Sequence, residues 1–290
     1  MDRPTARLLG DGSRLHLQHG PIDLIIGVDA PTPLIRTTAF QSASRRFNSI
    51  LSELVAELPL LKTAGALAEP KGKVARRMVD AIRPHTASHF VTPMAAVAGA
   101  VADEILLVLT TDLAITRAYV NNGGDIALHL AKATQYAAQI AGLDGSSHGR
   151  IVIDATTGVR GIATSGQGGR SLSFGIADSV TVLGRTAADA DVAATLIANA
   201  VDLQGSEAIT RTPASDHDPD SDLGHRLVVT HVGPLTTQEI SDALDAGAQV
   251  AQSMVQDGLI EGAALFLRHN QRIIGQLPHN PVQYEVTKHA

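Results

Sequence analysis

The stretch GIATSGQGGRSLSFGIADSVTVLGRTAADADVAAT (Gly161–Thr195) indicates the fold of this chain and holds its most unusual chemistry. Its first part, Gly161–Val182, contains five glycines but only one cation and one acid, Arg170 and Asp178. A Walker loop needs a lysine, which is absent, and a dinucleotide-binding loop must lead into a helix. Here Gly169 leads into RSLSF, which alternates as a strand does. Two interpretations stay open: a flexible loop, or a wall of backbone N–H groups and small hydroxyls that a ligand can approach closely.

The second part of the stretch predicts a strand, Ser179–Gly184, and then a helix, Ala187–Val201, with Thr186 as its N-cap residue. Asp191 and Thr195 stand four residues apart on that helix and therefore share one face. A carboxylate and a hydroxyl one turn apart can hold a hard cation such as Mg²⁺. A solvated polar stripe is the commoner explanation of such a pair, although the neighbouring residues of this helix are apolar.

The segment VNNGGDIAL predicts two strands joined by a tight turn at Asn122-Gly123-Gly124. Glycine suits the positive φ angles that such a turn requires, and Asp125 can cap the turn with its own side chain. These residues alone favour a plain hairpin turn. The alternative is a ligand that lies against the glycines.

Hydrophobic periodicity and turn residues predict the other elements. The predicted strands are a hairpin over Leu15–Val28, then Ile115–Asn121, Ile126–Leu130, Arg150–Ala155, Leu227–His231, Ala263–Arg268 and Gln271–Gln276, and the predicted helices are Ser44–Leu58, Val74–Ile82, Pro93–Leu109, Leu130–Ala141 and Thr236–Gln256. This mixture of hairpins and helices indicates an α+β fold with mixed or antiparallel sheets packed with helices.

The composition narrows the classes of protein. Of the 290 residues, 44% are hydrophobic, which excludes a disordered chain, and the absence of cysteine excludes disulfides and thiolate metal sites. A net charge of −6 argues against nucleic acid as a partner. There is no apolar signal segment, and the most apolar run is interrupted by Asp103 and Glu104, so we expect a soluble cytoplasmic protein without a membrane span. Because Thr236–Gln256 carries apolar residues on more than one side, we predict a homodimer.

Three of these elements, in this order, resemble the ApbE family, whose typical members are Mg²⁺-dependent FAD:protein FMN transferases. VNNGGDIAL resembles the family's G-G-D turn, GIATSGQG its A-T-S-G segment, and SVTVLGRTAADADVAAT its V-T-V strand and A-D-A-x-A-T helix. TPMAAVAGAVAD and GRSLSFGIADSVTV resemble an uncharacterised branch of ApbE-like proteins. The resemblance implies a single ApbE-like α+β domain over residues 1–290, or two intertwined halves of about 1–150 and 151–290.

The resemblance also implies a small-molecule ligand, FAD, FMN or a related compound, with Mg²⁺ held on its diphosphate by Asp191 and Thr195. The glycine-rich stretch then becomes part of a ligand-binding wall. The candidate catalytic residues are Asp178, Thr164 and Ser165, and the candidate ligand-binding residues are Asn122, Gly123, Gly124, Asp125, Gly166, Gly168, Ser171, Ser173, Thr92 and Met94.

One segment of the typical family pattern is missing. Transferases carry an H-x-x-x-D-P-x-T-G-like segment between A-T-S-G and V-T-V, where this chain has only QGGRSLSFGIAD. Three hypotheses therefore stay open. The first is Mg²⁺-dependent FMN transfer or FAD cleavage. The second is another catabolic or cofactor-metabolism reaction on the same scaffold, with Asp178 and the hydroxyl-rich strand Ser171–Ser173 in place of the missing segment. The third is a non-catalytic binding protein or assembly factor.

Overall fold

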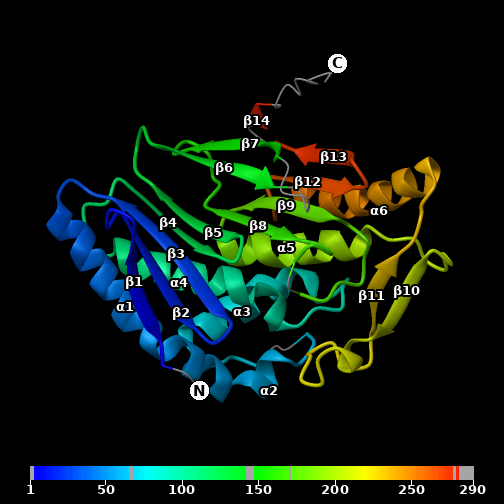
Figure 1. Ribbon diagram of the computed structural model, residues 1–290, viewed down its shortest axis with the longest axis horizontal. Coiled ribbons are helices and arrows are strands. Elements are labelled where there is room, and N and C mark those ends of the chain that lie inside the picture. The colour runs from blue at the N-terminus through cyan, green and yellow to red at the C-terminus, as the bar shows by residue number, and fades with distance from the viewer. Residues whose placement is uncertain (1–2, 66–67, 142–146, 170, 277–278, 281–290) are drawn as a thin grey trace.

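Strands from both halves of the chain join in one nine-stranded sheet in the order β1-β2-β3-β4-β5-β8-β9-β12-β13 (Figure 1). The structure is a computed structural model that describes residues 3–65, 68–141, 147–169, 171–276 and 279–280. Every neighbouring pair in this sheet is antiparallel. The strands are β1 (Thr5–Leu9), β2 (Arg14–His19), β3 (Ile22–Asp29), β4 (Arg117–Asn122), β5 (Asp125–Leu130), β8 (Gly161–Ser165), β9 (Ser179–Gly184), β12 (Gly262–Leu267) and β13 (Asn270–Gly275).

Two smaller antiparallel sheets complete the β structure. One pairs β10 (Ile209–Pro213) with β11 (Leu227–Val232), and the other has the order β14 (His279–Asn280), β7 (Ser147–Asp154), β6 (Gln135–Ala141). The predicted α+β class with antiparallel sheets is therefore confirmed. The division into one domain or two intertwined halves stays a prediction.

Helices cover one face of the large sheet. α1 (Pro33–Ala56), α4 (Val97–Thr110), α5 (Ala187–Ala200) and α6 (Thr237–Gln256) contact its strands, and α3 (Lys73–Ile82) packs on α4 and α5. The main hydrophobic core lies between these helices and the sheet. A second, smaller core lies on the opposite face, where the β6–β7 hairpin packs against β5, β8, β9 and β12. The sheet is thus buried on both faces in its middle.

The N-termini of the helices follow from local sequence. Thr32 opens α1 with its hydroxyl accepting from Ile35 N, and Thr186 opens α5 by accepting from Asp189 N, as predicted. Thr236 and Glu239 form the capping box that their spacing indicates. α1 begins at Pro33, well before the predicted Ser44, because Thr32 caps the helix there and the buried Ala39, Phe40 and Ala43 continue its apolar face.

α4 and α5 lie unusually close together, and small residues make this possible. A Cβ built at Gly99 would lie 2.3 Å from the Ala187 carbonyl oxygen. Asp103 of α4 caps the first turn of α5, where its carboxylate accepts from Ala187 N at 3.1 Å and Ala188 N at 2.9 Å. The alanine-rich faces of the two helices therefore meet each other in the core.

Two secondary-structure predictions were wrong. Residues Leu130–Ala141 do not form a helix: Ala133 has a positive φ of 65°, and Gln135–Ala141 is a strand paired with β7. The alanines of this segment favour a helix, but sheet pairing overrides their intrinsic propensity. Ser171–Ser173 is not a strand either, because these residues belong to an irregular loop between β8 and β9. Arg170 lies outside the described residues.

The stretch Pro93–Thr110, which contains α4, is long and apolar enough to cross a membrane, with a mean hydropathy of 1.6. Half of it is buried inside the protein, and core helices of soluble proteins pass the same test, so this is weak evidence. Its two acids also bind other helices: Asp103 caps α5, and Glu104 accepts from Arg46 and Arg77. The absence of a membrane partner stays a prediction.

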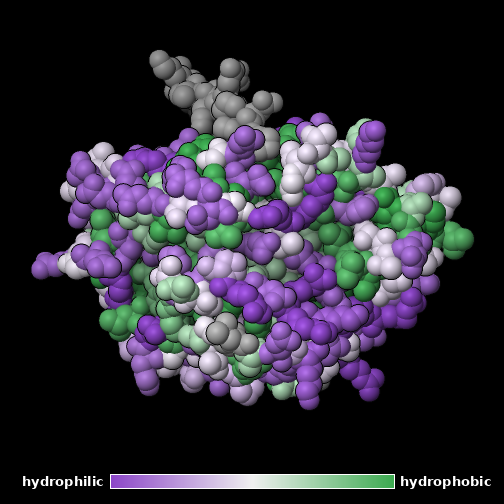
Figure 2. Space-filling view, turned by 180° about the vertical axis from the view of Figure 1, so that it is seen from behind, coloured by the Kyte–Doolittle hydropathy of each residue, from purple (hydrophilic) through white to green (hydrophobic). Residues whose placement is uncertain are grey.

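The apolar residues of α6 that suggested a homodimer are covered by the chain itself. Leu244 and Met254 are buried, and Ile240, Val250 and Val255 pack against the main core beside α5, β12 and β13. Seen from behind, the molecule has a face where hydrophilic side chains predominate and apolar ones are interspersed (Figure 2). The homodimer stays a prediction, and the apolar residues of α6 do not support it.

The α4–α5 contact predicts that Gly99→Ala destabilises the protein. Alanine normally stabilises a helix relative to glycine, but here its methyl group would overlap the Ala187 carbonyl. We expect the free energy of unfolding to fall by about 1–3 kcal/mol. Urea denaturation measures this. Gly158→Ala is the control, because a Cβ at Gly158 meets only the flexible Glu261 carboxylate. Equal or greater stability of Gly99→Ala would contradict the close contact.

The same contact predicts a pH dependence. Burial raises the pKa of Asp103 to about 6, although the Ala187 and Ala188 N–H groups lower it. The folded protein therefore holds this proton more tightly than the unfolded chain, and the contribution of Asp103 to stability decreases as the pH rises from about 4 to about 6. Relative to Asp103→Asn, the wild type should gain at most about 3 kcal/mol between about pH 7 and about pH 4. Urea denaturation at both pH values checks this, and a constant difference would contradict it.

Candidate functional site

A slot of about 410 Å³ lies between the large sheet and the β6–β7 hairpin, at the sheet edge where β4 turns into β5 and β8 ends. It brings together sequence motifs that are far apart in the chain. Its lining contains six of the predicted site residues: Gly123, Gly124, Thr164, Ser165, Gly168 and Asp178. The G-G-D turn and the A-T-S-G segment therefore form one site.

The slot has an apolar wall and a polar wall. Isoleucine side chains from β5, β6, β7 and β8 line the first, namely Ile126, Ile140, Ile151 and Ile162. Hydroxyl groups from β8 and β9 line the second, where Thr164 Oγ1 and Thr181 Oγ1 are hydrogen bonded at 2.9 Å. Among the described residues that line the slot there is no lysine, arginine or histidine. The slot therefore suits a flat apolar ring and offers no cation to an anionic group.

The Gly123-Gly124 turn has the positive φ angles that its sequence predicts. Gly123 has φ of 66° and Gly124 has φ of 118°, and the Asn121 Oδ1 atom accepts from Gly124 N at 2.8 Å. No heavy atom lies within 4 Å of a Cβ built at Gly124, so the main chain of the turn is open to a ligand. Both interpretations of the turn, the plain hairpin and the ligand contact, are compatible with this geometry.

The glycine-rich loop after β8 is held in place by its own main chain. Gly166 has φ of 140°, and a Cβ there would lie 2.7 Å from the Asp178 carbonyl oxygen. Gln167 N donates to Ala177 O at 2.8 Å, and Gly169 N donates to Gly166 O at 3.0 Å. These contacts close the loop against the start of β9. The loop is thus a wall of the slot and not a linker.

Asp178 has a structural partner. Its Oδ2 atom accepts from Arg268 N at 2.6 Å, and this bond holds the tight β12–β13 turn, where Arg268 and His269 have positive φ angles of 47° and 64°. The carboxylate still lines the slot. No histidine or lysine in the described lining stands beside Thr164 or Ser165 to act as a base.

A pair of carboxylates lies at the same sheet edge, on the side of the helices. Asp125 Oδ1 accepts from Thr164 N at 3.2 Å, and Asp191 Oδ2 accepts from Gly99 N at 3.0 Å. Burial and the neighbouring Asp125 carboxylate raise the pKa of Asp191 well above its ordinary value. Asn122 lies beside them and donates from its side chain to Ala98 O at 3.1 Å. Two acids held this close favour a cation or a shared proton between them.

The polar stripe of α5 continues from Asp191 through Thr195 to Asn199, all partly buried. Asn199 Oδ1 accepts from the Ser173 hydroxyl at 3.2 Å and from Phe174 N at 2.9 Å, so this end of the stripe anchors the loop after β8. Ser173 therefore serves the loop, while Ser171 is exposed.

Seven of the ten predicted ligand-binding residues do not line the slot, among them Thr92 and Met94. The buried Thr92 donates its hydroxyl to Asp222, which ties the start of the Pro93–Ala96 turn to the β10–β11 arm. Met94 packs against the main core. Neither residue lines the slot.

Sequence reasoning missed the wall that β6 and β7 supply. Gln139 and Ile140 line the slot because Gln135–Ala141 is a strand. Tyr136, Ala138 and Ile140 alternate toward the second core, and this period of two was the signal that alanine content concealed. Ser179 and Thr181 were also missed, although they lie in the V-T-V strand next to Thr164.

The turn geometry predicts that Gly124→Val is destabilising. A φ of 118° is strained for any side chain, even though the space beside Gly124 is open. We expect a loss on the order of 1–3 kcal/mol in the free energy of unfolding. A thermal melt measures the effect. Gly123→Asn serves as the control, because asparagine tolerates the left-handed φ of 66°. A silent Gly124→Val variant would mean that the turn rearranges freely.

Comparison with known proteins places the chain in a family. A family model described as "AbpE bacteria" matches residues 6–277. Relatives named UPF0280 protein include one from Methanothrix thermoacetophila, 40% identical over 122 residues, which are 40% of this chain and 49% of the relative. Another, from Methanopyrus kandleri, is 35% identical over 161 residues, 54% of this chain and 62% of the relative. The chain thus spans about half to three-fifths of the length of these curated relatives.

Two solved structures align with nearly the whole chain. The apo form of the flavinyl transferase ApbE from Pseudomonas stutzeri aligns over 96% of both chains with a TM-score of 0.43 and 13% identity. The flavin transferase ApbE from Vibrio cholerae aligns over 93% of this chain and 97% of its own, with a TM-score of 0.39 and 14% identity.

Proposed function

Because this chain belongs to the AbpE bacteria family, which confirms the resemblance carried by its three motifs, we propose that it binds a flavin nucleotide with the help of Mg²⁺. The proposed reaction class is FMN transfer or FAD cleavage. One observation carries the proposal. A slot with one apolar wall and a pair of carboxylates, the buried Asp125 and the partly buried Asp191, meet at the same end of the sheet strands, and no cationic side chain lines the slot in the described part of the chain.

The slot suits the ring of a flavin. Its volume of about 410 Å³ is within the usual range for small-molecule sites. Ile126, Ile140 and Ile162 offer an apolar surface to a flat aromatic ring, while the Thr164 and Thr181 hydroxyls can bond to polar atoms on the ring edge. The open main chain at Gly124 lets the rest of the ligand pass over the sheet edge toward the helices.

The diphosphate of such a ligand would need a cation that the protein side chains do not supply. Asp125 and Asp191 provide hard oxygen donors at the sheet edge, and Thr195 adds a hydroxyl on the same helix face as Asp191. The described residues contain no cluster of three or more acids, histidines or cysteines for a metal. A two-carboxylate site fits Mg²⁺, which usually keeps waters and takes further oxygens from a substrate phosphate. When bound, Mg²⁺ neutralises charge on phosphate oxygens and stabilises a leaving phosphate.

The chain's own residues would act mainly by positioning. Gly99 N holds the Asp191 carboxylate toward Asp125, and Thr164 N holds Asp125. The raised pKa of Asp191 means that a bound cation must displace its proton, so metal binding should strengthen as the pH rises. The loop closed by Gly166 keeps Ser165 and Gly168 at the slot.

A second candidate function is binding without turnover. Asp178 is occupied by Arg268 N, and the Thr164 hydroxyl is bonded to Thr181, so the described lining offers no nucleophile with an adjacent base. A carrier or assembly factor needs only the slot and the cation site. The hypothesis of another catabolic or cofactor-metabolism reaction on the same scaffold is not favoured by a comparable observation among the described residues.

The test mixes purified full chain with FAD and MgCl₂ and follows flavin absorbance and AMP release. FAD binding with AMP release supports the transferase or hydrolase proposal. FAD binding without AMP release, in the presence of a threonine-containing acceptor peptide, supports the binding protein. If neither FAD nor FMN binds in the presence of Mg²⁺, both candidate functions are contradicted.

The cation site predicts the behaviour of Asp191→Asn. The variant keeps the acceptor for Gly99 N but loses the carboxylate charge, so the fold should persist. Flavin affinity at saturating Mg²⁺ should fall at least about tenfold, the equivalent of one charge-assisted contact. Titration calorimetry with and without EDTA measures it. Asp189→Asn, on another face of α5, is the matched control and should bind as the wild type does. Equal Mg²⁺ dependence in both variants would rule Asp191 out.

A further inference from the structure

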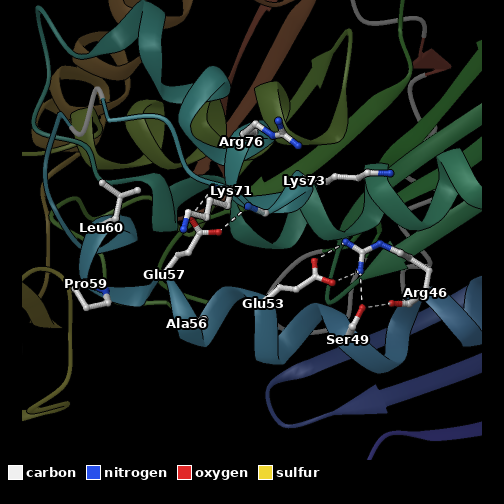
Figure 3. Close-up of a pocket in the computed structure, with 11 residues that line it drawn as sticks. Arg46, Ser49, Glu53, Ala56, Glu57, Pro59, Leu60, Lys71, Lys73 and Arg76 are labelled. Atoms are coloured by element: carbon white, nitrogen blue, oxygen red, sulfur yellow. Dashed lines mark hydrogen bonds and ion pairs between the residues drawn. The ribbon is translucent and has the colours of Figure 1, made fainter.

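A larger cavity, of about 1030 Å³, lies on the helical side of the molecule and shares no lining residue with the slot (Figure 3). It is a groove bounded by the C-terminal half of α1, by α2 (Leu58–Leu61) and by the first turn of α3. Four cationic side chains line it, Arg46, Lys71, Lys73 and Arg76, although the whole chain carries a net charge of −6.

The two acids of the groove are already satisfied within the protein. Glu53 accepts from Arg46 with both carboxylate oxygens at 2.8 Å, and this bonding lowers the pKa of Glu53. Glu57 accepts from Lys71 N and Gly72 N, each at 2.7 Å. Lys73 also attracts the Glu53 carboxylate electrostatically, but in the described part of the chain neither acid forms a hydrogen bond or ion pair with a side chain of α3.

Arg46 is also committed. Besides Glu53, its Nε atom donates at 2.8 Å to Glu104, which is only 1% exposed and also accepts from Arg77. These four side chains form a fixed ionic floor between α1, α3 and α4. Arg46 thus belongs to the scaffold of the groove.

The remaining cations of the groove are Lys71, Lys73 and Arg76. Within the described part of the chain, the side chains of Lys71, Lys73 and Arg76 make no hydrogen bond or ion pair, and all three are exposed. In Figure 3 Lys73 and Arg76 extend from α3, Glu53 extends from α1 on the other side of the groove, and the Glu57 carboxylate lies beside the chain at the start of α3. Three accessible positive charges therefore border one concave surface.

Lys73 and Arg76 lie in the first turn of α3, where positive charges lower the stability of the helix. The first turn of α3 contains no acid, and its N-cap residue, Gly72, provides no side-chain cap. The positive end of the helix dipole disfavours nearby cations such as Lys73. The same end, with its free N–H groups, favours an incoming anion. The Glu57 carboxylate already accepts from Gly72 N at this end of α3, so the exposed Lys73 and Arg76 side chains are left to bind a further anion in the groove.

The groove also has an apolar flank. Ala56, Pro59 and Leu60 line the end near α2. We propose that this groove binds a small organic phosphate, with the phosphate at Lys73 and Arg76 and the apolar or aromatic body against Leu60. A concave cavity of this volume is typical of small-molecule sites and not of flat protein–protein contacts. The site is independent of the proposed flavin function and needs no metal, because its own side chains supply the positive charge.

The experiment titrates the full chain with AMP by calorimetry at low ionic strength in EDTA, with inorganic phosphate as the comparison. AMP should bind more tightly than phosphate. The double variant Lys73→Gln/Arg76→Gln should lose at least about tenfold in AMP affinity. Its thermal stability without ligand should be equal to that of the wild type or higher, because two cations leave the positive end of α3.

Three controls make the outcome decisive. Arg14→Gln/Lys132→Gln removes the same charge from exposed positions outside the groove and should keep wild-type affinity. Asp191→Asn should also keep it in EDTA, which separates this site from the flavin proposal. The inference fails if AMP does not bind the wild type, if both double variants lose binding alike, or if hexaglutamate binds and AMP does not. The last result would assign the groove to an acidic protein partner.

Discussion

The close approach of α4 and α5 is the constraint on which the other features of the site depend. Gly99 lets the α4 backbone come within contact of the Ala187 carbonyl, and Asp103 then closes the first turn of α5. The reverse contact is made by Asp191 of α5, which accepts from Gly99 N. The two helices thus hold each other through one glycine and two carboxylates. Any side chain at Gly99 would separate them and move Asp191 away from the sheet edge.

This arrangement places two carboxyl groups in the protein interior, from which charged groups are ordinarily excluded. Asp125 and Asp191 face each other beside the end of β8, and their mutual repulsion disfavours the state in which both are ionised. Such a pair costs stability unless a cation or a proton lies between them. Perturbed carboxylates in a site with an adjacent slot are typical of functional positions. The carboxylates and the slot therefore support the same proposal from opposite faces of the sheet.

The two cavities differ in the charge of the side chains that line them. The slot has hydroxyls, an acid and apolar walls, and anionic ligands reach it only with a cation. The groove at α3 has three exposed cations whose side chains form no hydrogen bond or ion pair in the described part of the chain, and it can attract an anion directly. Since the phosphate-bearing ligand proposed for each cavity requires positive charge, dependence on metal distinguishes the two sites experimentally.

The sequence by itself determined the strand Ser179–Gly184, the caps at Thr186 and Thr236, the glycine turn and the shared face of Asp191 and Thr195, because these depend on neighbours within a few residues. Only the tertiary structure decided that Gln135–Ala141 is a strand, since its pairing with β7 outweighs alanine's preference for helix. It also placed Asp125 beside Asp191, and it placed the β6–β7 wall over the slot. Such contacts join residues far apart in the chain, and no local pattern records them.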